Sequence, residues 1–440
     1  MKSILAKTTL AAMVALAAPL AAMAAEKAPS AKAKPAAARN MEKWKAKSGD
    51  WKRQREEIKT VDFIGKTQKI IVARGGDYKD YQAHPTTAML GDGKTLFCVW
   101  NIGHGGFASP VAKSEDGGLS WKRVDEVMPK CYSLFKNCPS IYRIKAPDGK
   151  ERMFVLAQKT MTRKGAEITE QSENYSGFMP RVVSEDNGKT WRALPPLGTS
   201  DLTSPFMCVM TFASMVELKD GSTLGMFHRG NSKGQDRGLC VMQSTTKDGG
   251  LTWSTPKMVL SPEDIDGKAQ PCEPFVFRSP DGSELCCILR ENSRTNGTSL
   301  VMFSRDEGKT WSKPIDTPWA LTGDRHCGIY LPDGRLLIVF RDQVPDRGLP
   351  EGWYFSAWIG SYDDIKNGKA GQYRVILSKT FKLKKPHGRM IFDGYYAGLH
   401  QLADGTIIAT TYECLEGDKA CSIVAHRFRL ADIEAAAKAR

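Results

Sequence analysis

Residues 114–121 read SEDGGLSW, and the same pattern of Ser or Thr, Asp, Gly, Ser or Thr and Trp recurs three more times. The further copies are SEDNGKTW at 184–191, TKDGGLTW at 246–253 and SRDEGKTW at 304–311. Short Asp and hydroxyl side chains bond the backbone of tight turns, Gly supplies a positive φ, and the Trp fills apolar space beside the turn. We therefore interpret all four copies as structural repeats with no part in chemistry.

A second repeat consists of Asp-Gly steps that each precede a run of β-forming residues. The steps are Asp92-Gly93, Asp148-Gly149, Asp220-Gly221, Asp281-Gly282, Asp333-Gly334 and Asp404-Gly405. An Asp-Gly step between apolar runs is typical of a β-hairpin, because tight hairpin turns need positive φ. Six such hairpins, spaced 52 to 72 residues apart, predict an all-β, six-bladed β-propeller over residues 61–430.

The ends of the chain differ in composition from this repeated region. Lys2 and Lys7 precede an apolar, Ala-rich run that ends in Ala22-Met23-Ala24, which is typical of a secretory signal peptide. We expect residues 1–24 to be removed on export, giving a periplasmic or secreted protein. Residues 25–60 read as a basic, Ala/Lys-rich linker with a short helix, and residues 431–440 as a C-terminal tail.

Net charge and cysteine content narrow the class of partner. The chain carries a formal charge of +14, but residues 1–60 alone hold 13 Lys and Arg against 5 Asp and Glu. The remaining excess favours an anionic carbohydrate over nucleic acid. No later stretch is long and apolar enough to span a membrane, and no ligand spacing indicates a metal or another cofactor. Among the 11 cysteines, Cys414 and Cys421 are the best-spaced pair for a disulfide.

Equivalent positions in the six hairpins predict which side chains meet at the centre. The innermost strands of a propeller converge on its axis. Four residues lie about eight positions before an Asp-Gly step: His84, Phe212, Glu273 and Tyr396. In the other two hairpins, His326 lies seven positions and Cys138 ten positions before the Asp-Gly step. These side chains are expected to lie close together although they are far apart in sequence.

Counting forward from the same turns reaches three arginines. Arg229, Arg290 and Arg341 each end an apolar strand eight or nine residues after the turn. Guanidinium groups bind carboxylates through two parallel hydrogen bonds, so the three residues fit an anion-binding cluster. Ordinary salt bridges between blades are the alternative.

With these residues in place, the chain resembles the sialidase superfamily, whose propellers carry Asp-box (BNR) repeats like those above. YYAGLHQLADGTIIATTYE at 395–413 resembles the family's late Tyr-containing segment and implies Tyr396 as nucleophile. CEPFVFRSPDGSELCCILR at 272–290 resembles its Glu-to-Arg stretch, which implies Glu273 as partner of that Tyr and Arg290 as a carboxylate-binding arginine. Arg341 is the best positional match for another such arginine. The resemblance implies an exo-acting glycoside hydrolase.

Two departures from the family pattern concern the substrate and the proton donor. Ala83-His84-Pro85 stands where the family has its first arginine, and residues 93–114 contain no acidic side chain where the family has its acid/base Asp. His104 in this loop is a possible general acid, since imidazole titrates near neutral pH. Asp324, Arg325 and His326 form a further polar cluster, interpreted either as part of the site or as a buried His held by a carboxylate.

The sequence thus leaves more than one function open. The first is an exported exo-glycosidase that removes a terminal, anionic sugar such as sialic acid by means of Tyr396, Glu273 and the arginines. Histidine acid/base chemistry on another sugar, a carbohydrate-binding propeller without catalysis, and a protein-interaction propeller are the alternatives. Neither the sugar nor the oligomeric state follows from the sequence.

Overall fold

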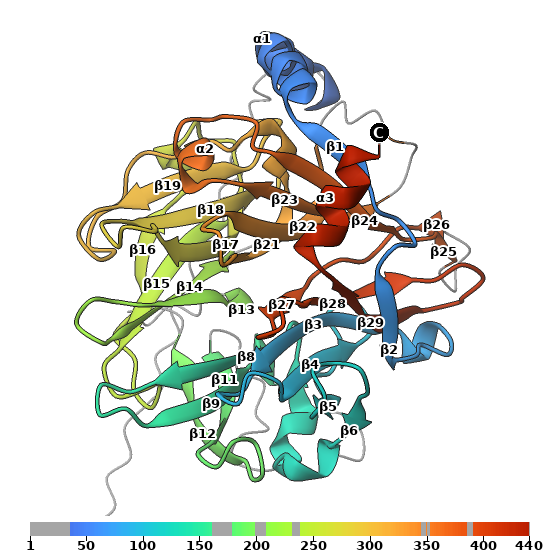
Figure 1. Cartoon of the computed structure of the whole chain (residues 1–440). Coiled ribbons are helices and arrows are strands. Elements are labelled where there is room, and N and C mark those ends of the chain that lie inside the picture. Colours follow the sequence, from blue (N-terminus) through green and yellow to red (C-terminus); the bar gives the residue numbers. More distant parts are fainter. Residues whose placement is uncertain are drawn as a thin grey trace, which may run out of the picture.

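The computed structural model describes residues 36–160, 178–198, 208–230, 238–344, 349, 353–384 and 390–439, and it is a six-bladed β-propeller (Figure 1). The predicted fold is confirmed. The expected signal peptide, residues 1–24, lies outside the described residues. None of the helices in the described ranges is both long and apolar enough to cross a membrane.

The six blades are antiparallel sheets whose strands follow one another along the chain. Blade 1 contains β3 (Gln82–Met89), β4 (Leu96–Ile102), β5 (Val111–Ser114) and β6 (Lys122–Arg123). Blade 2 contains β8 (Ser140–Lys145), β9 (Glu151–Leu156), β11 (Phe178–Ser184) and β12 (Arg192–Gly198). Blade 3 contains β13 (Cys208–Glu217), β14 (Thr223–Arg229), β15 (Cys240–Thr246) and β16 (Lys257–Leu260).

The second half of the ring repeats this plan, and its last blade takes one strand from the start of the chain. Blade 4 contains β17 (Pro271–Arg278), β18 (Leu285–Glu291), β19 (Leu300–Ser304) and β20 (Ile315–Asp316). Blade 5 contains β21 (Gly323–Tyr330), β22 (Leu336–Asp342), β23 (Tyr354–Gly360) and β24 (Tyr373–Lys379). Blade 6 contains β27 (Gly398–Gln401), β28 (Ile407–Cys414), β29 (Cys421–Phe428) and β2 (Gln68–Ala73).

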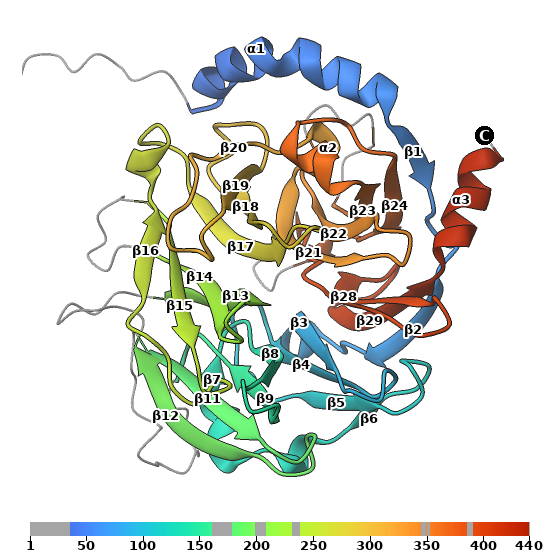
Figure 2. The ribbon, with the colours of Figure 1, turned by 60° about the vertical axis from the view of Figure 1, so that its left-hand side comes forward.

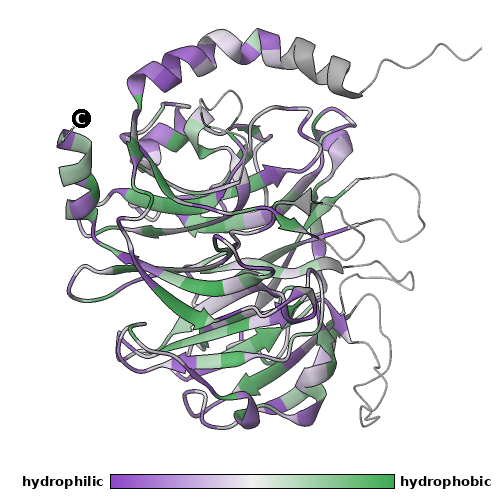
Figure 3. Ribbon diagram, turned by 90° about the vertical axis from the view of Figure 1, so that its right-hand side faces the viewer, coloured by the Kyte–Doolittle hydropathy of each residue, from purple (hydrophilic) through white to green (hydrophobic). Residues whose placement is uncertain are grey.

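Shorter elements connect or cover the blades. The remaining strands are β1 (Lys59–Asp62), β7 (Phe135–Lys136), β10 (Lys159–Thr160), β25 (Leu383–Lys384) and β26 (Met390–Ile391). The α-helices are α1 (Ala36–Glu57), α2 (Tyr362–Lys366) and α3 (Leu430–Lys438). Single 3-10 turns span Tyr78–Asp80, Asp125–Val127, Lys130–Leu134, Pro262–Asp264 and Trp319–Leu321. Hydrophobic residues concentrate on the strands of the blades (Figure 3).

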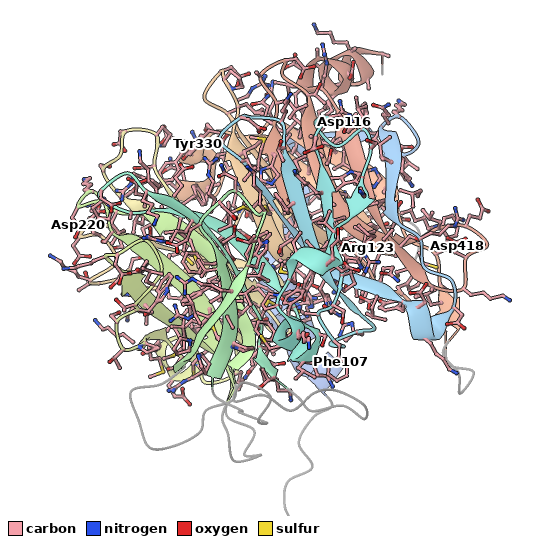
Figure 4. The ribbon with its side chains drawn as sticks, turned by 90° about the horizontal axis from the view of Figure 1, so that it is seen from below. Phe107, Asp116, Arg123, Asp220, Tyr330 and Asp418 are labelled. Carbon is pink, nitrogen blue, oxygen red and sulfur yellow. The ribbon has the colours of Figure 1, made fainter. Side chains whose placement is uncertain are left out.

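Both sequence repeats have the structural roles expected of them. Each Asp-Gly step joins the first two strands of a blade, and the six glycines have φ between 70° and 86°. Each SEDGGLSW-like repeat joins the third and fourth strands of blades 1 to 4. In the third copy, Thr252 N donates to Asp248 Oδ1 over 2.9 Å and Trp253 Nε1 donates to Gly250 O over 3.1 Å. Asp116, of the first copy, is exposed, and its Oδ1 accepts from Ser120 N over 2.9 Å within the same turn (Figure 4).

The ring is closed by strands from opposite ends of the chain. β2 pairs antiparallel with β29, with Ile70 opposite Ala425, so the first strand of the ring completes the last blade. β1 adds a parallel fifth strand to blade 5 through β24. Helix α3 packs its buried Ile433 and Ala437 beside Val61 of β1.

Cys414 and Cys421 are opposite one another on β28 and β29, as the proposed disulfide required. Both are nevertheless free thiols, as are the eight further cysteines whose side chains the structure describes. The expected disulfide is therefore absent from the structure.

Helix α1 lies across the outside of blades 4 and 5, within the segment expected to be a linker (Figure 2). Trp51 is buried in the hydrophobic cluster that contains Trp319 and Phe340. Gln54 Oε1 accepts a hydrogen bond of 2.8 Å from Trp319 N, and Trp44 Nε1 donates one of 3.2 Å to Arg294 O. Residues 36–57 are thus an integral part of the folded unit.

Replacing Trp51 with Ala is expected to lower the free energy of unfolding by about 3–5 kcal/mol, the usual cost of removing a buried Trp side chain. Lys52→Ala, on the exposed face of the same helix, is the matched control and should change stability by less than about 0.5 kcal/mol. Denaturant unfolding of the two variants measures the difference. Equal midpoints would show that α1 does not stabilise the propeller.

Candidate active site

The site forms where the innermost strands break their pairing register. β3, β13, β17 and β21 each lose register with the next strand of their blade at the same level. His84, Glu273 and Arg325 lie at three of these breaks with φ of 53°, 50° and 53°, and Cys138, before β8, has a φ of 43°. Positive φ in a residue other than Gly costs roughly 1–3 kcal/mol and is concentrated at functional sites.

This geometry corrects one positional assignment. The residue of blade 5 that is equivalent to His84 and Glu273 is Arg325, exactly as many residues before its Asp-Gly turn as they are. His326, the residue expected there, instead donates from Nε2 to Leu321 O over 2.9 Å and lies beside the ring of Phe340. A uniform count of eight residues back from Asp333 selects Arg325, whereas the expectation of His326 used a count of seven.

Tyr396 and Glu273 meet directly, although they come from blades 6 and 4. The hydroxyl of Tyr396 donates a hydrogen bond to Glu273 Oε1. Arg290, from β18, places Nη1 at 3.0 Å from the same carboxylate oxygen and 3.2 Å from the Tyr396 hydroxyl oxygen. His228 supports the arrangement, because the backbone N–H of Glu273 donates to its Nδ1 over 3.2 Å.

The protonation states of this pair follow from burial and neighbouring charge. Burial and the nearby Glu273 carboxylate hold the pKa of Tyr396 well above its usual value of 10.0. Burial opposes ionisation of Glu273 too, but Arg290 and the hydrogen bond from Tyr396 outweigh it and lower the pKa of Glu273. At neutral pH the structure therefore holds a phenol beside a carboxylate, the arrangement in which the carboxylate acts as general base.

Arg290, Arg294 and Arg341 converge, and each of these three is also ion-paired to a carboxylate. Arg290 Nε lies 3.0 Å from Asp324 Oδ1, and Arg294 Nη2 lies 2.8 Å from the same oxygen. Arg341 Nη1 lies 3.6 Å from Asp324 Oδ2, and its guanidinium carbon is 5.0 Å from the centre of the Tyr396 ring. Salt bridges between blades and an arginine cluster thus coexist. Arg229 is the last residue of β14, where its backbone is paired with Cys240 of β15.

One positive charge of the cluster has no carboxylate paired with it. Among the described carboxylates, none forms an ion pair with the buried Arg325, whose Nη1 lacks a hydrogen-bond partner. Four buried or half-buried arginines therefore face three carboxylates. The arginines are Arg290, Arg294, Arg325 and Arg341, and the carboxylates are Glu273, Asp324 and Asp393. A ligand with a single negative charge would balance the cluster.

A cavity of about 180 Å³ continues along the propeller axis beside Arg325. Its walls come from the innermost strands of all six blades. They include Thr86, Tyr142, Ser214, Phe275, Arg325 and Leu399. In the described residues, no group of three or more His, Cys, Asp or Glu side chains is placed to hold a metal ion.

Asp393 is a central residue that the sequence analysis missed. Its Oδ1 accepts hydrogen bonds from the Tyr412 hydroxyl at 2.9 Å and from Arg341 Nη2 at 3.1 Å. Its Oδ2 bonds His104 Nδ1 at 2.8 Å and accepts from the hydroxyl of Tyr81. Its closeness to Tyr396, three residues later in the sequence, was the one local indication. Counting back from the hairpin turns selects Tyr396 but not Asp393.

His84 and His104 lie beside Tyr396 and Asp393, and His326 lines the axial cavity next to Arg325. The ring of His84 is 5.0 Å from that of Tyr396 and 4.8 Å from that of His104, measured between centres. His84 Nδ1 bonds Asn101 Oδ1 at 3.2 Å, and its buried Nε2 has no partner. Burial lowers the pKa of His84 to about 3, so its ring is neutral and Nε2 is a free acceptor for a ligand.

The residues from 110 to 349 match the family model of the BNR repeat-like domain. This chain belongs to that family. None of the curated protein sequences matches the chain, so the other likenesses are to solved structures.

Several solved propellers resemble this BNR repeat-like protein in fold. A Dyadobacter fermentans protein described as of unknown function is 18% identical, with a TM-score of 0.58, covering 83% of this chain and 99% of that one. The α-L-arabinofuranosidase Arb93A of Fusarium graminearum is 15% identical, with a TM-score of 0.54, over 84% and 100% of the two chains. A Trypanosoma rangeli sialidase mutant is 12% identical, with a TM-score of 0.53, over 86% and 61%.

We expect Asp393→Asn to lower stability by about 3–5 kcal/mol at neutral pH, because it removes the carboxylate that pairs with buried Arg341. Burial raises the pKa of Asp393, but His104 and Arg341 outweigh it and depress the pKa below 3.8. A depressed pKa contributes stability that is present above the unfolded value and lost as pH falls.

Unfolding midpoints of the protein and the variant, compared from pH 7 to pH 3, check this expectation. The difference between the two should shrink as pH drops below about 4. Asp404→Asn, at an exposed ion pair with Arg429, is the control. A difference that does not change with pH would contradict an ionised Asp393.

Proposed function

We propose that this protein is a glycoside hydrolase that removes a terminal sugar carrying one negative charge, such as sialic acid or a similar acidic sugar. The observation that carries the proposal is the three-way contact of Tyr396, Glu273 and Arg290. A phenol held by an ionised carboxylate and a guanidinium is a nucleophile next to its base. The likeness to sialidases and an arabinofuranosidase supports glycoside hydrolysis as the class of reaction.

A tyrosine nucleophile suits an acidic sugar for an electrostatic reason. A carboxylate nucleophile would be repelled by a carboxylate on the anomeric carbon, whereas a phenol is neutral until it reacts. As the Tyr396 oxygen attacks the anomeric carbon, its proton passes to Glu273 Oε1 and the bond to the leaving oxygen breaks. Water would then attack the anomeric carbon of the glycosyl–tyrosine intermediate, the bond to the phenolic oxygen would break, and the sugar would leave with retained configuration.

The charge of the arginine cluster supports the sugar class. A ligand carboxylate would offset the one excess positive charge among Arg290, Arg294, Arg325 and Arg341. Because Arg290 and Arg341 are already held by Asp324 and Asp393, their guanidinium groups are oriented before a ligand arrives. Such preorganisation reduces the cost of ordering side chains on binding.

Two alternatives have specific observations in their favour. The absence of the family's first arginine at Ala83-His84-Pro85 favours a carbohydrate-binding propeller that holds a sugar without cleaving it. The pair of rings formed by His84 and His104, 4.8 Å apart, favours histidine acid/base chemistry on another sugar. The predicted signal peptide, residues 1–24, places any of these activities in the periplasm or outside the cell, and an N-terminal sequence of the exported protein tests that placement.

Turnover of aryl glycosides of sialic acid, glucuronic acid, rhamnose and galactose tests the proposal. We expect release from an acidic sugar and a loss of at least about 10²-fold in kcat for Tyr396→Phe, which removes the attacking oxygen. Tyr330→Phe is the matched control, since Tyr330 lies at the outer edge of the molecule and donates to Arg278 O over 2.8 Å (Figure 4).

The possible results separate the candidate functions. Release from rhamnose or galactose alone would overturn the acidic-sugar class and favour a glycosidase that acts on another sugar. Saturable binding of a sugar with no release from any glycoside would favour the binding propeller. Unchanged kcat in Tyr396→Phe would exclude this tyrosine as the nucleophile.

A further inference from the structure

The loop between β4 and β5 presents His104 to the site at the place where the sequence has no acidic residue. About two thirds of the His104 side chain is exposed, whereas the Asp393 side chain that bonds its Nδ1 is 4% exposed. With Nδ1 occupied by Asp393, the remaining nitrogen, Nε2, is available to a ligand. The ring lies beside His84, which in turn contacts Tyr396.

Asp393 is held firmly enough to orient this imidazole. The Tyr81 and Tyr412 hydroxyls, Arg341 Nη2 and the backbone N–H of Gly394 all donate to its two oxygens. Its carboxylate therefore stays ionised and accepts from Nδ1–H of His104, which leaves Nε2 as the nitrogen that gains and loses a proton.

The loop does not need this contact for its own shape. Gly103 N donates to Tyr81 O over 2.6 Å, Gly106 N to Gly103 O over 3.2 Å and Ile102 N to Phe107 O over 3.0 Å. These backbone bonds define the turn that carries His104. The hydrogen bond from the exposed imidazole of His104 to the buried carboxylate of Asp393 is therefore better explained by a catalytic role of His104 than by a need to hold the loop in place.

We propose, on the basis of the proposed function above, that His104 is the catalytic acid/base that protonates the leaving group and that Asp393 is its positioning residue. In the first step the bond from the anomeric carbon to the leaving oxygen breaks, and that oxygen takes the proton from His104 Nε2. The Tyr396 oxygen forms the new bond to the anomeric carbon and passes its proton to Glu273.

The second step reverses these proton movements. Water loses a proton to His104 Nε2 as its oxygen bonds the anomeric carbon. The bond from the sugar to Tyr396 breaks, and the departing phenolate oxygen regains the proton from Glu273. The sum is one glycoside and one water converted into one sugar and one alcohol, with His104, Tyr396 and Glu273 restored.

Leaving-group dependence tests this assignment, because an acid catalyst matters most when the leaving oxygen is a poor one. We compare the 4-nitrophenyl and methyl glycosides of the sugar that the protein accepts. For His104→Gln we expect a loss of about 10²- to 10⁴-fold in kcat/KM on the methyl glycoside, the range that general acid catalysis contributes. The loss on the 4-nitrophenyl glycoside should be less than about tenfold.

Two further measurements distinguish chemistry from structure. Azide, a nucleophile that needs no base, should restore turnover of the 4-nitrophenyl glycoside by His104→Gln and yield the glycosyl azide. Asp393→Asn should show the same leaving-group pattern with a smaller loss, while Asp404→Asn, at its exposed ion pair, should resemble the unmodified protein.

The outcomes separate this inference from the proposed function. Equal losses on both glycosides, without azide rescue, would overturn the role of His104 while the Tyr396→Phe result still supports the tyrosine nucleophile. Retention of full activity on the methyl glycoside by His104→Gln would overturn it as well. If the unmodified protein cleaves neither glycoside of any sugar tested, the proposed function and this inference fail together.

Discussion

The pairing of β2 with β29 is the interaction on which the rest of the structure depends. It joins residues about 350 positions apart and fixes blade 6 in place. Blade 6 packs against blade 1 through a core that contains Ala83, Trp100, Tyr412 and Ile423. At the same interface, the hydroxyl of Tyr81, which precedes blade 1, donates to Asp393. Asp393 also accepts a hydrogen bond from the hydroxyl of Tyr412 in blade 6. Without ring closure, neither the core nor this part of the site would form.

The site uses the crowding of six strands around one axis. At the level of the register breaks, the innermost strands turn side chains toward the axis at the cost of positive φ in His84, Glu273 and Arg325. The attraction between the arginines and the carboxylates offsets the free-energy cost of removing these charges from water. The result is a polar centre within an apolar ring, with its proton carriers and charges in fixed positions.

Much of this arrangement was predictable from the sequence, because the repeats have local physical causes. Asp-Gly turns and the four Trp-containing repeats depend on residues next to one another, so counting along the chain found Tyr396, Glu273, Arg290 and Arg341. The inward position in blade 5 was assigned to His326, seven residues before its turn, although the spacing of eight shared by His84 and Glu273 selects Arg325.

Other features depend on contacts that no local pattern shows. Asp393 lies in a connecting segment, and four of its five hydrogen-bond donors are side chains from other elements, while the fifth is the N–H of the adjacent Gly394. The full length of α1 was likewise unpredictable, since its basic composition resembles a linker and its anchor, Trp319, lies about 270 residues away.

The unbonded pair Cys414 and Cys421 has a consequence for the chemical durability of the protein. Burial raises the pKa of Cys414 to about 12 and that of Cys421 well above its usual value of 9.0. Only the thiolate attacks a disulfide, so these buried thiols exchange slowly whatever the redox potential of the surroundings. The two cysteines are thereby kinetically protected, and Asp393, whose carbonyl oxygen contacts the Cys421 sulfur, keeps its position under oxidising conditions.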